Sequence, residues 1–213
     1  MVGSFGRRCA CMVTAGLLLF AGTFEGRAAA DDSRICARDS GEIAIDACSR
    51  AIKSGRYKGH DLARQYLNRG VEWRLKQDYD LALADLGEAA RIDKKYADAF
   101  YNRCVIYNFK GDYDRAIAEC SQAIKLGPSA NAMTAVGGEM LGKDRTVSDY
   151  YSERGFAYLK KDDYLHAMLD LDNAVRLNPN NGRALRSRGL AYQAKGDTAR
   201  GDADLAAAKQ LGE

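Results

Sequence analysis

Four cysteines, arranged as two symmetric pairs, are the residues of this chain whose types and spacing most clearly suggest chemistry. Cys104 and Cys120 are sixteen residues apart, Cys36 and Cys48 are twelve apart, and each pair brackets a polar, turn-like centre. If each segment is an antiparallel helical hairpin, the two cysteines lie level between helix axes about 8–10 Å apart. That spacing can bring the α-carbons within the roughly 4.4–6.8 Å that a disulfide requires.

Three kinds of chemistry are open to such pairs. A disulfide would stabilise each hairpin by about 3 kcal/mol, whereas free cysteines would be small buried apolar residues. A catalytic thiol pair is the third option, but the chain after residue 30 has no C-x-x-C motif. Because both members of each pair occur together, we predict the disulfides Cys36–Cys48 and Cys104–Cys120.

The first thirty residues predict export to an oxidising compartment, where disulfides persist. A basic start, MVGSFGRR, precedes the apolar run CMVTAGLLLFAG, and Ala28 and Ala30 are the small residues expected before a cleavage site. The run is shorter than the roughly 18 residues that a membrane span needs. We therefore predict a signal peptide cleaved after Ala30, and not an uncleaved anchor, so that the mature protein is periplasmic or secreted without stable membrane insertion.

The remaining chain is periodic, with a repeat of 34 residues in the segments 63–96, 97–130, 148–181 and 182–213. The eleventh position of each segment is aromatic and the twenty-seventh is alanine: Trp73, Tyr107, Tyr158 and Tyr192, then Ala89, Ala123, Ala174 and Ala208. The sixteenth position is an aspartate suited to cap a second helix: Asp78, Asp112, Asp163 and Asp197. Each segment therefore predicts two amphipathic helices around a turn, which must stack on their neighbours to bury their apolar stripes.

This pattern resembles the tetratricopeptide repeat (TPR) family of the exported bacterial type. Small residues recur in phase at the expected helix crossing, and Pro128 and Pro179 end two units. Lys94 and Gly201 depart from the family pattern, where proline and alanine are expected. The resemblance implies an all-α, TPR-type α-solenoid of antiparallel helical hairpins.

The repeats divide the chain into five parts. Residues 1–30 are the signal peptide, and 31–62 hold a truncated first repeat and a linker, since AIDACSRAIKSG matches AIAECSQAIKLG of a later unit. Residues 63–130 contain two repeats, 131–147 an insertion that loops out, and 148–213 two further repeats. The insertion is as compatible with a role at the binding site as with none.

A second periodicity concerns charge. The seventh position is always arginine and the twenty-third is always acidic: Arg69, Arg103, Arg154 and Arg188, then Asp85, Glu119, Asp170 and Asp204. These positions lie almost level on the two helices, so we expect structural ion pairs within or between units. An arginine row that binds an anion is the alternative, but the acids at matching spacing would neutralise it.

The resemblance also implies a concave groove, lined by the first helices, that holds a peptide or helix of a partner. The expected groove residues are Asn68, Val71, Arg74, Tyr101, Asn102, Val105, Asn108, Phe109, Phe156, Arg186 and Leu190. Some TPR grooves clamp a C-terminal carboxylate with lysine, arginine and asparagine. Asn102 matches that clamp, but Leu67 and Val71 depart from it, and Asp149 and Glu153 oppose its charge, so we do not expect this ligand class.

Nothing in the residues predicts catalysis, a cofactor or a metal site. The two histidines, His60 and His166, have no metal-ligand spacing, and the chain has no phosphate loop or nucleophile elbow. Residues 1–30 hold three arginines and one glutamate, so their removal lowers the formal net charge from +3 to +1. A chain so nearly neutral has no electrostatic reason to bind nucleic acid.

Two functions agree with these observations. The first is a non-catalytic, exported protein–protein interaction scaffold that binds another envelope protein or peptide in the groove. The second is a structural envelope protein that forms a homodimer through its last repeat, after which no polar capping helix follows. Light scattering separates the two.

Overall fold

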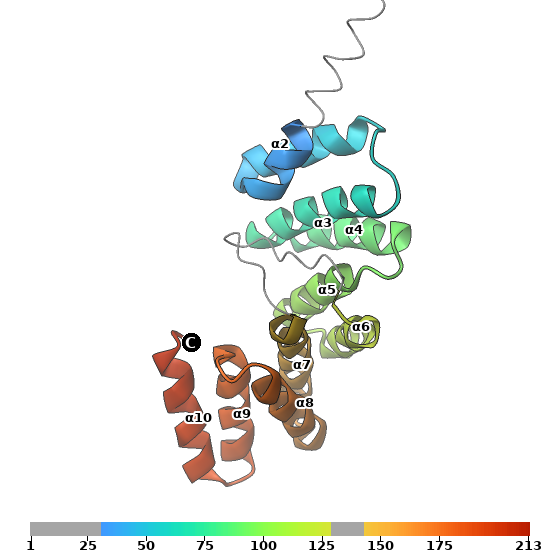
Figure 1. Cartoon of the computed structure of the whole chain (residues 1–213). Coiled ribbons are helices and arrows are strands. Elements are labelled where there is room, and N and C mark those ends of the chain that lie inside the picture. The colour runs from blue at the N-terminus through green and yellow to red at the C-terminus, as the bar shows by residue number, and fades with distance from the viewer. Residues whose placement is uncertain (1–30, 129–142) are drawn as a thin grey trace, which may run out of the picture.

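The computed structural model describes residues 31–128 and 143–213, and these residues form antiparallel helical hairpins stacked in chain order (Figure 1). The hairpins are 31–38 with α2 (Gly41–Lys53), α3 (Gly59–Leu75) with α4 (Tyr79–Ile92), α5 (Ala97–Lys110) with α6 (Tyr113–Leu126), α7 (Lys143–Lys160) with α8 (Tyr164–Leu177), and α9 (Gly182–Ala194) with α10 (Thr198–Gln210). The predicted all-α solenoid is confirmed. Within the two described ranges, no helix is both long and apolar enough to cross a membrane.

Helix α7 begins earlier than the repeat pattern indicated. It starts at Lys143, so the residues 143–147 of the predicted insertion are helical. The sequence there has no proline or glycine after Gly142, and nothing stops the helix from extending backwards by more than a turn. Residues 131–142 of the insertion, like the predicted signal peptide, lie outside the described residues.

The turn inside each hairpin follows one backbone pattern. The residue before the capping aspartate has a positive φ: 64° at Gln77, 73° at Gly111, 58° at Asp162 and 86° at Gly196. The carboxylates of Asp112, Asp163 and Asp197 then accept a hydrogen bond from a backbone N–H in the first turn of the second helix, whereas Asp78 makes no such bond. Three of the four predicted caps are therefore confirmed.

The core lies where the two helices of a hairpin cross and where one hairpin meets the next. The small residues Ala82, Ala116 and Ala167 are fully buried at the crossings. Ile106 of α5 packs in one cluster with Leu86 of α4, which joins two consecutive hairpins. Because each hairpin buries its stripe against its neighbours, the first helices α3, α5, α7 and α9 are held in a fixed row.

Candidate functional site: disulfides, hairpin junctions and the row of first helices

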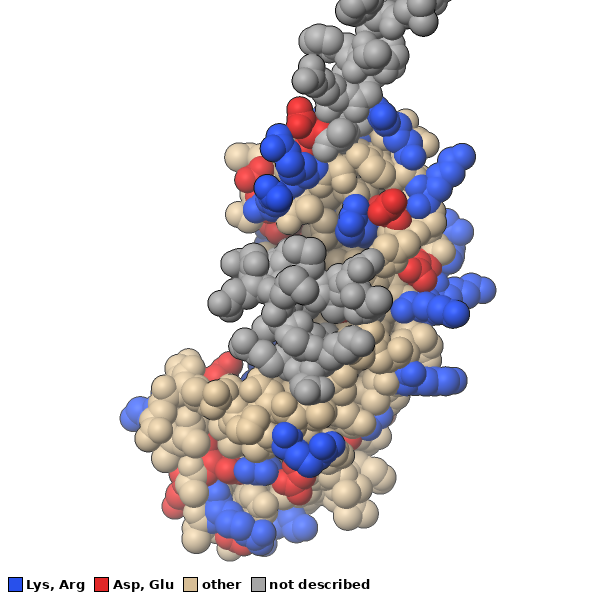
Figure 2. All heavy atoms as spheres, in the orientation of Figure 1, with Lys and Arg blue, Asp and Glu red and all other residues tan. Residues whose placement is uncertain are grey.

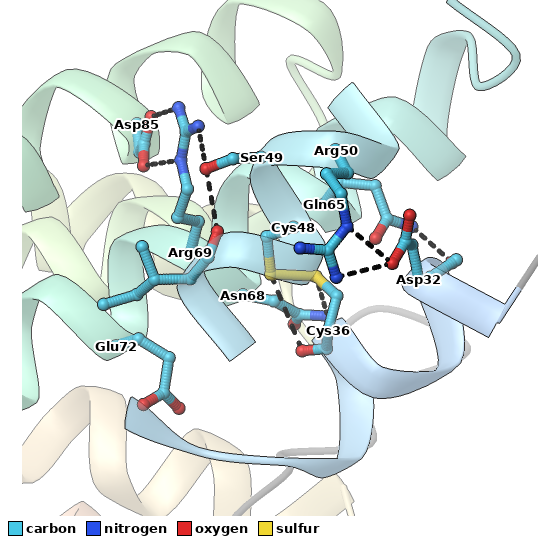
Figure 3. The surroundings of a disulfide bond; sticks show 12 residues. Asp32, Cys36, Cys48, Ser49, Arg50, Gln65, Asn68, Arg69, Glu72 and Asp85 are labelled. Atoms are coloured by element: carbon cyan, nitrogen blue, oxygen red, sulfur yellow. Dashed lines mark hydrogen bonds and ion pairs between the residues drawn. A yellow bond between two sulfur atoms is a disulfide. The ribbon is translucent and has the colours of Figure 1, made fainter. Parts of the chain in front are cut away.

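Both predicted disulfides are present. The α-carbons are 4.7 Å apart in Cys36–Cys48 and 5.4 Å apart in Cys104–Cys120, and all four residues are buried. The first bond joins the helix 31–38 to α2 (Figure 3), and the second joins α5 to α6. The bonds lie inside the hairpins, where they stabilise structure and offer no exposed sulfur for redox catalysis.

The structure explains why the cysteine of α5 and the cysteine of α6 replace two residues at once. At the same positions the three other full hairpins hold a glycine and a leucine. A Cβ built on Gly70 would lie 2.9 Å from Leu86 Cγ. At Gly155 the corresponding distance to Leu171 Cγ is 2.8 Å. A leucine on one helix therefore requires a glycine on the other, and a cysteine fits only where the leucine is gone.

The predicted arginine–acid pairs all form within their own hairpins. Arg69, Arg154 and Arg188 each bind an aspartate of the second helix through two guanidinium nitrogens at 2.7–2.9 Å. Arg103 pairs with Glu119 at 2.7 Å. The hydrogen bond to Asp85 raises the pKa of Arg69, whereas burial raises the pKa of Glu119 although Arg103 opposes it.

The third guanidinium nitrogen links a hairpin to the one before it, a contact that the sequence prediction above does not include. Arg69 Nη1 donates to Ser49 Oγ at 2.9 Å (Figure 3), Arg154 Nη1 donates to Ser121 Oγ at 2.9 Å, and Arg188 Nη1 pairs with Asp172 at 3.0 Å. The equivalent partner of Arg103 would be residue 87, which is glycine. The position is twenty-fifth in each repeat, so the periodic alignment held a signal for this junction contact.

The predicted groove residues differ widely in exposure. Asn102, Val105 and Asn108 are buried, Phe109 is 61% exposed, Leu190 is 37% exposed and Arg186 is exposed. The others are half-buried: Asn68, Val71, Arg74, Tyr101 and Phe156. The amide of Asn102 donates to the Asp98 carbonyl of its own helix at 2.8 Å, so one of its two N–H donors is already used and the side chain is buried.

A buried polar network connects three of the first helices. The amide of Asn108 on α5 donates to the backbone oxygen of Glu153 at 3.0 Å and to its carboxylate at 2.9 Å. The same carboxylate pairs with Arg183 of α9. Burial, together with the nearby acids Glu153 and Asp149, raises the pKa of Tyr101. The network holds α5, α7 and α9 in register and leaves the tyrosine neutral.

Neighbouring helices use two further polar contacts. Tyr150 of α7 donates to Asp98 of α5 at 2.9 Å, where burial raises the pKa of the aspartate. Asn68 of α3 reaches the sulfur of Cys36 at 3.8 Å. These residues therefore serve at least partly to pack one first helix against the next, which the pattern of a single repeat does not indicate.

The described ranges contain no cluster of His, Cys, Asp or Glu that could hold a metal ion. The ring nitrogen Nδ1 of His166 lies 2.7 Å from Asp163 Oδ2, and Nδ1 of His60 lies 2.6 Å from Asp93 Oδ2. On the face of the molecule seen in Figure 2, basic and acidic side chains are interspersed and no continuous patch of one sign forms.

Comparison with known proteins agrees with this geometry. Residues 97–129 and 148–181 match the tetratricopeptide repeat family. The fold is similar to that of MamA from Desulfovibrio magneticus RS-1, with a TM-score of 0.66 over 88% of this chain and 94% of that chain at 14% identity. No curated protein sequence matches the chain.

Two other solved structures share the fold. One is the APC/C hetero-tetramer Cut9–Hcn1, with a TM-score of 0.63 over 80% of this chain and 30% of that chain at 18% identity. The other is the first TPR of Spaghetti (RPAP3) bound to the HSP90 peptide SRMEEVD, with a TM-score of 0.55 over 67% of this chain and 99% of that chain at 21% identity. Residues 97–129 and 148–181 are therefore tetratricopeptide repeats, and the described chain folds as a TPR-like solenoid.

Proposed function

We propose that the protein is an exported, non-catalytic scaffold that binds an extended peptide or a helix of another envelope protein along its first helices. The observation that carries this proposal is a row of exposed and half-buried apolar side chains on α3, α5, α7 and α9. Its members are Val71, Tyr101, Phe109, Phe156 and Leu190. Phe109 and Leu190 are exposed and the other three are half-buried. Apolar groups that reach the surface in a row on rigid elements favour a binding surface for a peptide or helix.

The charges beside this row indicate what the partner offers. Arg74 Nε is buried and has no hydrogen-bond partner among the described residues, and Arg186 is exposed on α9. Glu153 is occupied by Asn108 and Arg183. The surface therefore suits a partner segment with apolar anchors and an acceptor, such as a backbone carbonyl or a carboxylate side chain, near Arg74.

The RPAP3 repeat shows that a fold of this kind holds a short peptide. In this chain, however, Asn102 is buried and bonded to its own helix, so a clamp for a terminal carboxylate is not the mode that we propose. We propose recognition of an internal segment, in which main-chain groups and two or three apolar side chains supply the contacts.

The test is a comparison of two double variants of the mature protein. Phe109→Ala with Leu190→Ala removes the most exposed apolar groups of the row, whereas Ile43→Ala with Leu81→Ala removes equally exposed groups on second helices. Crosslinking to envelope extract, followed by mass spectrometry, should recover a partner with the wild type and the second variant and not with the first. Equal recovery with both variants would refute the row as the binding surface.

Export has its own test. We propose that residues 1–30 are removed after Ala30 and that the mature chain is periplasmic or secreted. Mass spectrometry of the protein from a fractionated producing cell should give an N-terminus at Asp31 in the envelope fraction. An intact N-terminus in the cytosol would contradict export, but would leave the interaction function untouched.

Self-association is the second candidate function, and Leu211, exposed at the end of α10, is the observation that favours it. A dimer through the last hairpin would bury this side chain against its copy. Light scattering from micromolar to submillimolar concentration, compared with Leu211→Ser, separates the candidates. A monomer throughout removes the dimer, whereas a dimer that the variant dissociates supports it.

A further inference from the structure

A row of lysine–acid pairs joins consecutive hairpins at the end where their turns lie. Lys110, at the end of α5, pairs with Asp80 at the start of α4 at 2.9 Å. Lys76 pairs with Glu42 in the same way one hairpin earlier, and Lys161 pairs with Asp114 one hairpin later. Each lysine is the fourteenth residue of its repeat, and each acid is the eighteenth of the preceding one.

The row stops at the last junction. Lys195 is the fourteenth residue of the last repeat, but the eighteenth residue of the preceding repeat is Leu165. The register has not changed there, because Arg188 still reaches Asp172 across the same junction at 3.0 Å. Lys195 is exposed, and among the described residues no acid pairs with it.

The leucine that replaces the acid is not alone. Leu169 lies four residues later, so both side chains share one face of α8. Leu165 is 67% exposed and Leu169 is 56% exposed. At the position of Leu169 the other full repeats carry only alanine: Ala84, Ala118 and Ala203. An acid and an alanine have thus become two leucines on the outer side of one hairpin, beside a lysine without its usual partner.

We propose that Leu165, Leu169 and Lys195 form a second docking site, which takes an amphipathic helix of another protein carrying a carboxylate between apolar side chains. The two leucines at helical spacing match the apolar face of such a helix, and the carboxylate takes the place that Glu42, Asp80 and Asp114 fill at the other junctions. This site lies on α8 and on the turn after α9 and does not use the residues of the row of first helices, so it goes beyond the scaffold function proposed above.

Charge decides between an acidic and a basic partner. Other basic groups of the same hairpins are engaged elsewhere: Lys161 pairs with Asp114, Arg200 pairs with Asp197, and Lys160 lies over the ring of Phe156. The nearby acids Asp163 and Asp172 are paired as well, with His166 and Arg188. Lys195 is therefore the charged group that can pair with a docked helix, and its positive charge favours a helix that carries a carboxylate. Three anchor residues make a small contact, so the affinity should be weak, on the order of 10–100 μM.

The test uses two helix-stabilised peptides with identical leucine positions, one with glutamate and the other with lysine on the flanks, and measures binding to the mature protein by fluorescence anisotropy. The wild type should bind the glutamate peptide about tenfold or more tightly than the lysine peptide, and added salt should weaken the binding. Equal binding of both peptides, or no binding, would overturn the proposal.

The double leucine variant and the control use residue types that the other repeats carry, and Lys195→Glu changes an exposed side chain, so the fold should persist. Leu165→Asp with Leu169→Ala gives α8 the residues that α6 carries at these positions, restores an acid for Lys195 and should abolish binding. Lys195→Glu should reverse the preference between the peptides. The control Leu81→Arg, which removes an exposed leucine elsewhere and installs the type found at Arg115 and Arg200, should bind like the wild type.

Two outcomes would assign the surface differently. If Leu165→Asp with Leu169→Ala binds the glutamate peptide as the wild type does, the leucines are not the site. If light scattering shows a dimer that this variant dissociates, the occupant is a second copy and the acidic partner is refuted. Neither result touches the row of first helices, because the Phe109→Ala/Leu190→Ala comparison reports on that surface alone.

Discussion

The hairpins α5–α6 and α7–α8 share one backbone plan but close it in different ways. In α7–α8, Leu171 fills the space over Gly155, and Arg154 reaches Ser121 of the preceding hairpin. In α5–α6, a disulfide occupies the crossing. The residue of the preceding hairpin that would accept a hydrogen bond from Arg103 is Gly87, which has no side chain. The covalent bond thus lies in the hairpin that lacks one polar contact to its predecessor. Close packing and a crosslink are alternative solutions for the same crossing.

Breaking the crosslink should give the largest effect. Cys104→Ala with Cys120→Ala removes the bond and leaves space in a fully buried crossing, and we expect a loss of about 3 kcal/mol in the free energy of unfolding. Cys104→Gly with Cys120→Leu installs the solution of α7–α8 and should lose less. Urea unfolding of both variants and of the wild type, with and without reductant, measures these losses in the free energy of unfolding. Equal losses for the two variants would contradict the comparison.

Breaking the packed crossing should cost somewhat less. Gly155→Ala places a Cβ against Leu171 Cγ, which is fully buried, and we expect a loss of about 2 kcal/mol. Gly87→Ala is the matched control, because its Cβ meets nothing within 4 Å and alanine favours a helix. Thermal unfolding should move in opposite directions for the two variants. A gain for Gly155→Ala would show that the crossing tolerates a Cβ after all.

Restoring the missing junction contact should sharpen the comparison. Gly87→Ser offers Arg103 the hydroxyl that Ser49 and Ser121 offer elsewhere, and we expect a gain of about 1.5 kcal/mol from helix propensity and a new hydrogen bond. Repeating both residue-87 substitutions with Arg103→Lys separates the two causes. With Arg103→Lys present, Gly87→Ser should lose part of its gain in the free energy of unfolding, whereas Gly87→Ala should lose none. An equal gain for Gly87→Ser in both backgrounds would exclude the junction hydrogen bond.

The smallest effect concerns the turn. Gln77 and Asp162 adopt the left-handed backbone that glycine provides at positions 111 and 196. Gln77→Gly removes that strain, and after the extra freedom of glycine in the unfolded chain we expect a net gain of about 0.5 kcal/mol. Chemical unfolding should detect this gain. Gly111→Ala introduces the same strain at the equivalent turn and should lower the free energy of unfolding. A destabilised Gln77→Gly protein would contradict the assignment of strain.

The sequence allowed most of the fold to be predicted, because each constraint recurs at a fixed interval. The four arginine–acid pairs and three aspartate caps follow from that period, and the two disulfides follow from the symmetry of each cysteine pair about its turn. The same alignment also contains the lysine–acid pairs and the contacts of the twenty-fifth position. These contacts join residues of two consecutive repeats, so positions compared within a single repeat do not indicate them.

The candidate groove was less predictable. Asn102, Val105 and Asn108 occupy positions that the repeat pattern marks as accessible, yet they are buried. Their burial depends on how closely α5 approaches α7, which is set by particular contacts such as Asn108 to Glu153 and Tyr150 to Asp98. No pattern within one repeat encodes the approach between repeats. Exposure of Phe109 and Leu190, by contrast, followed the pattern.

The first disulfide has a consequence for the N-terminal end of the stack. The helix 31–38 is too short to be stable by itself. Apart from Cys36, it is held by contacts such as Asp32 to Arg50 (Figure 3) and Ser33 to Gln65. Reduction would leave it to fray and would expose the buried alanines of α2. Whether this tip is ordered thus depends on the thiol–disulfide potential around the protein, so completion of the fold is tied to the place where the chain resides.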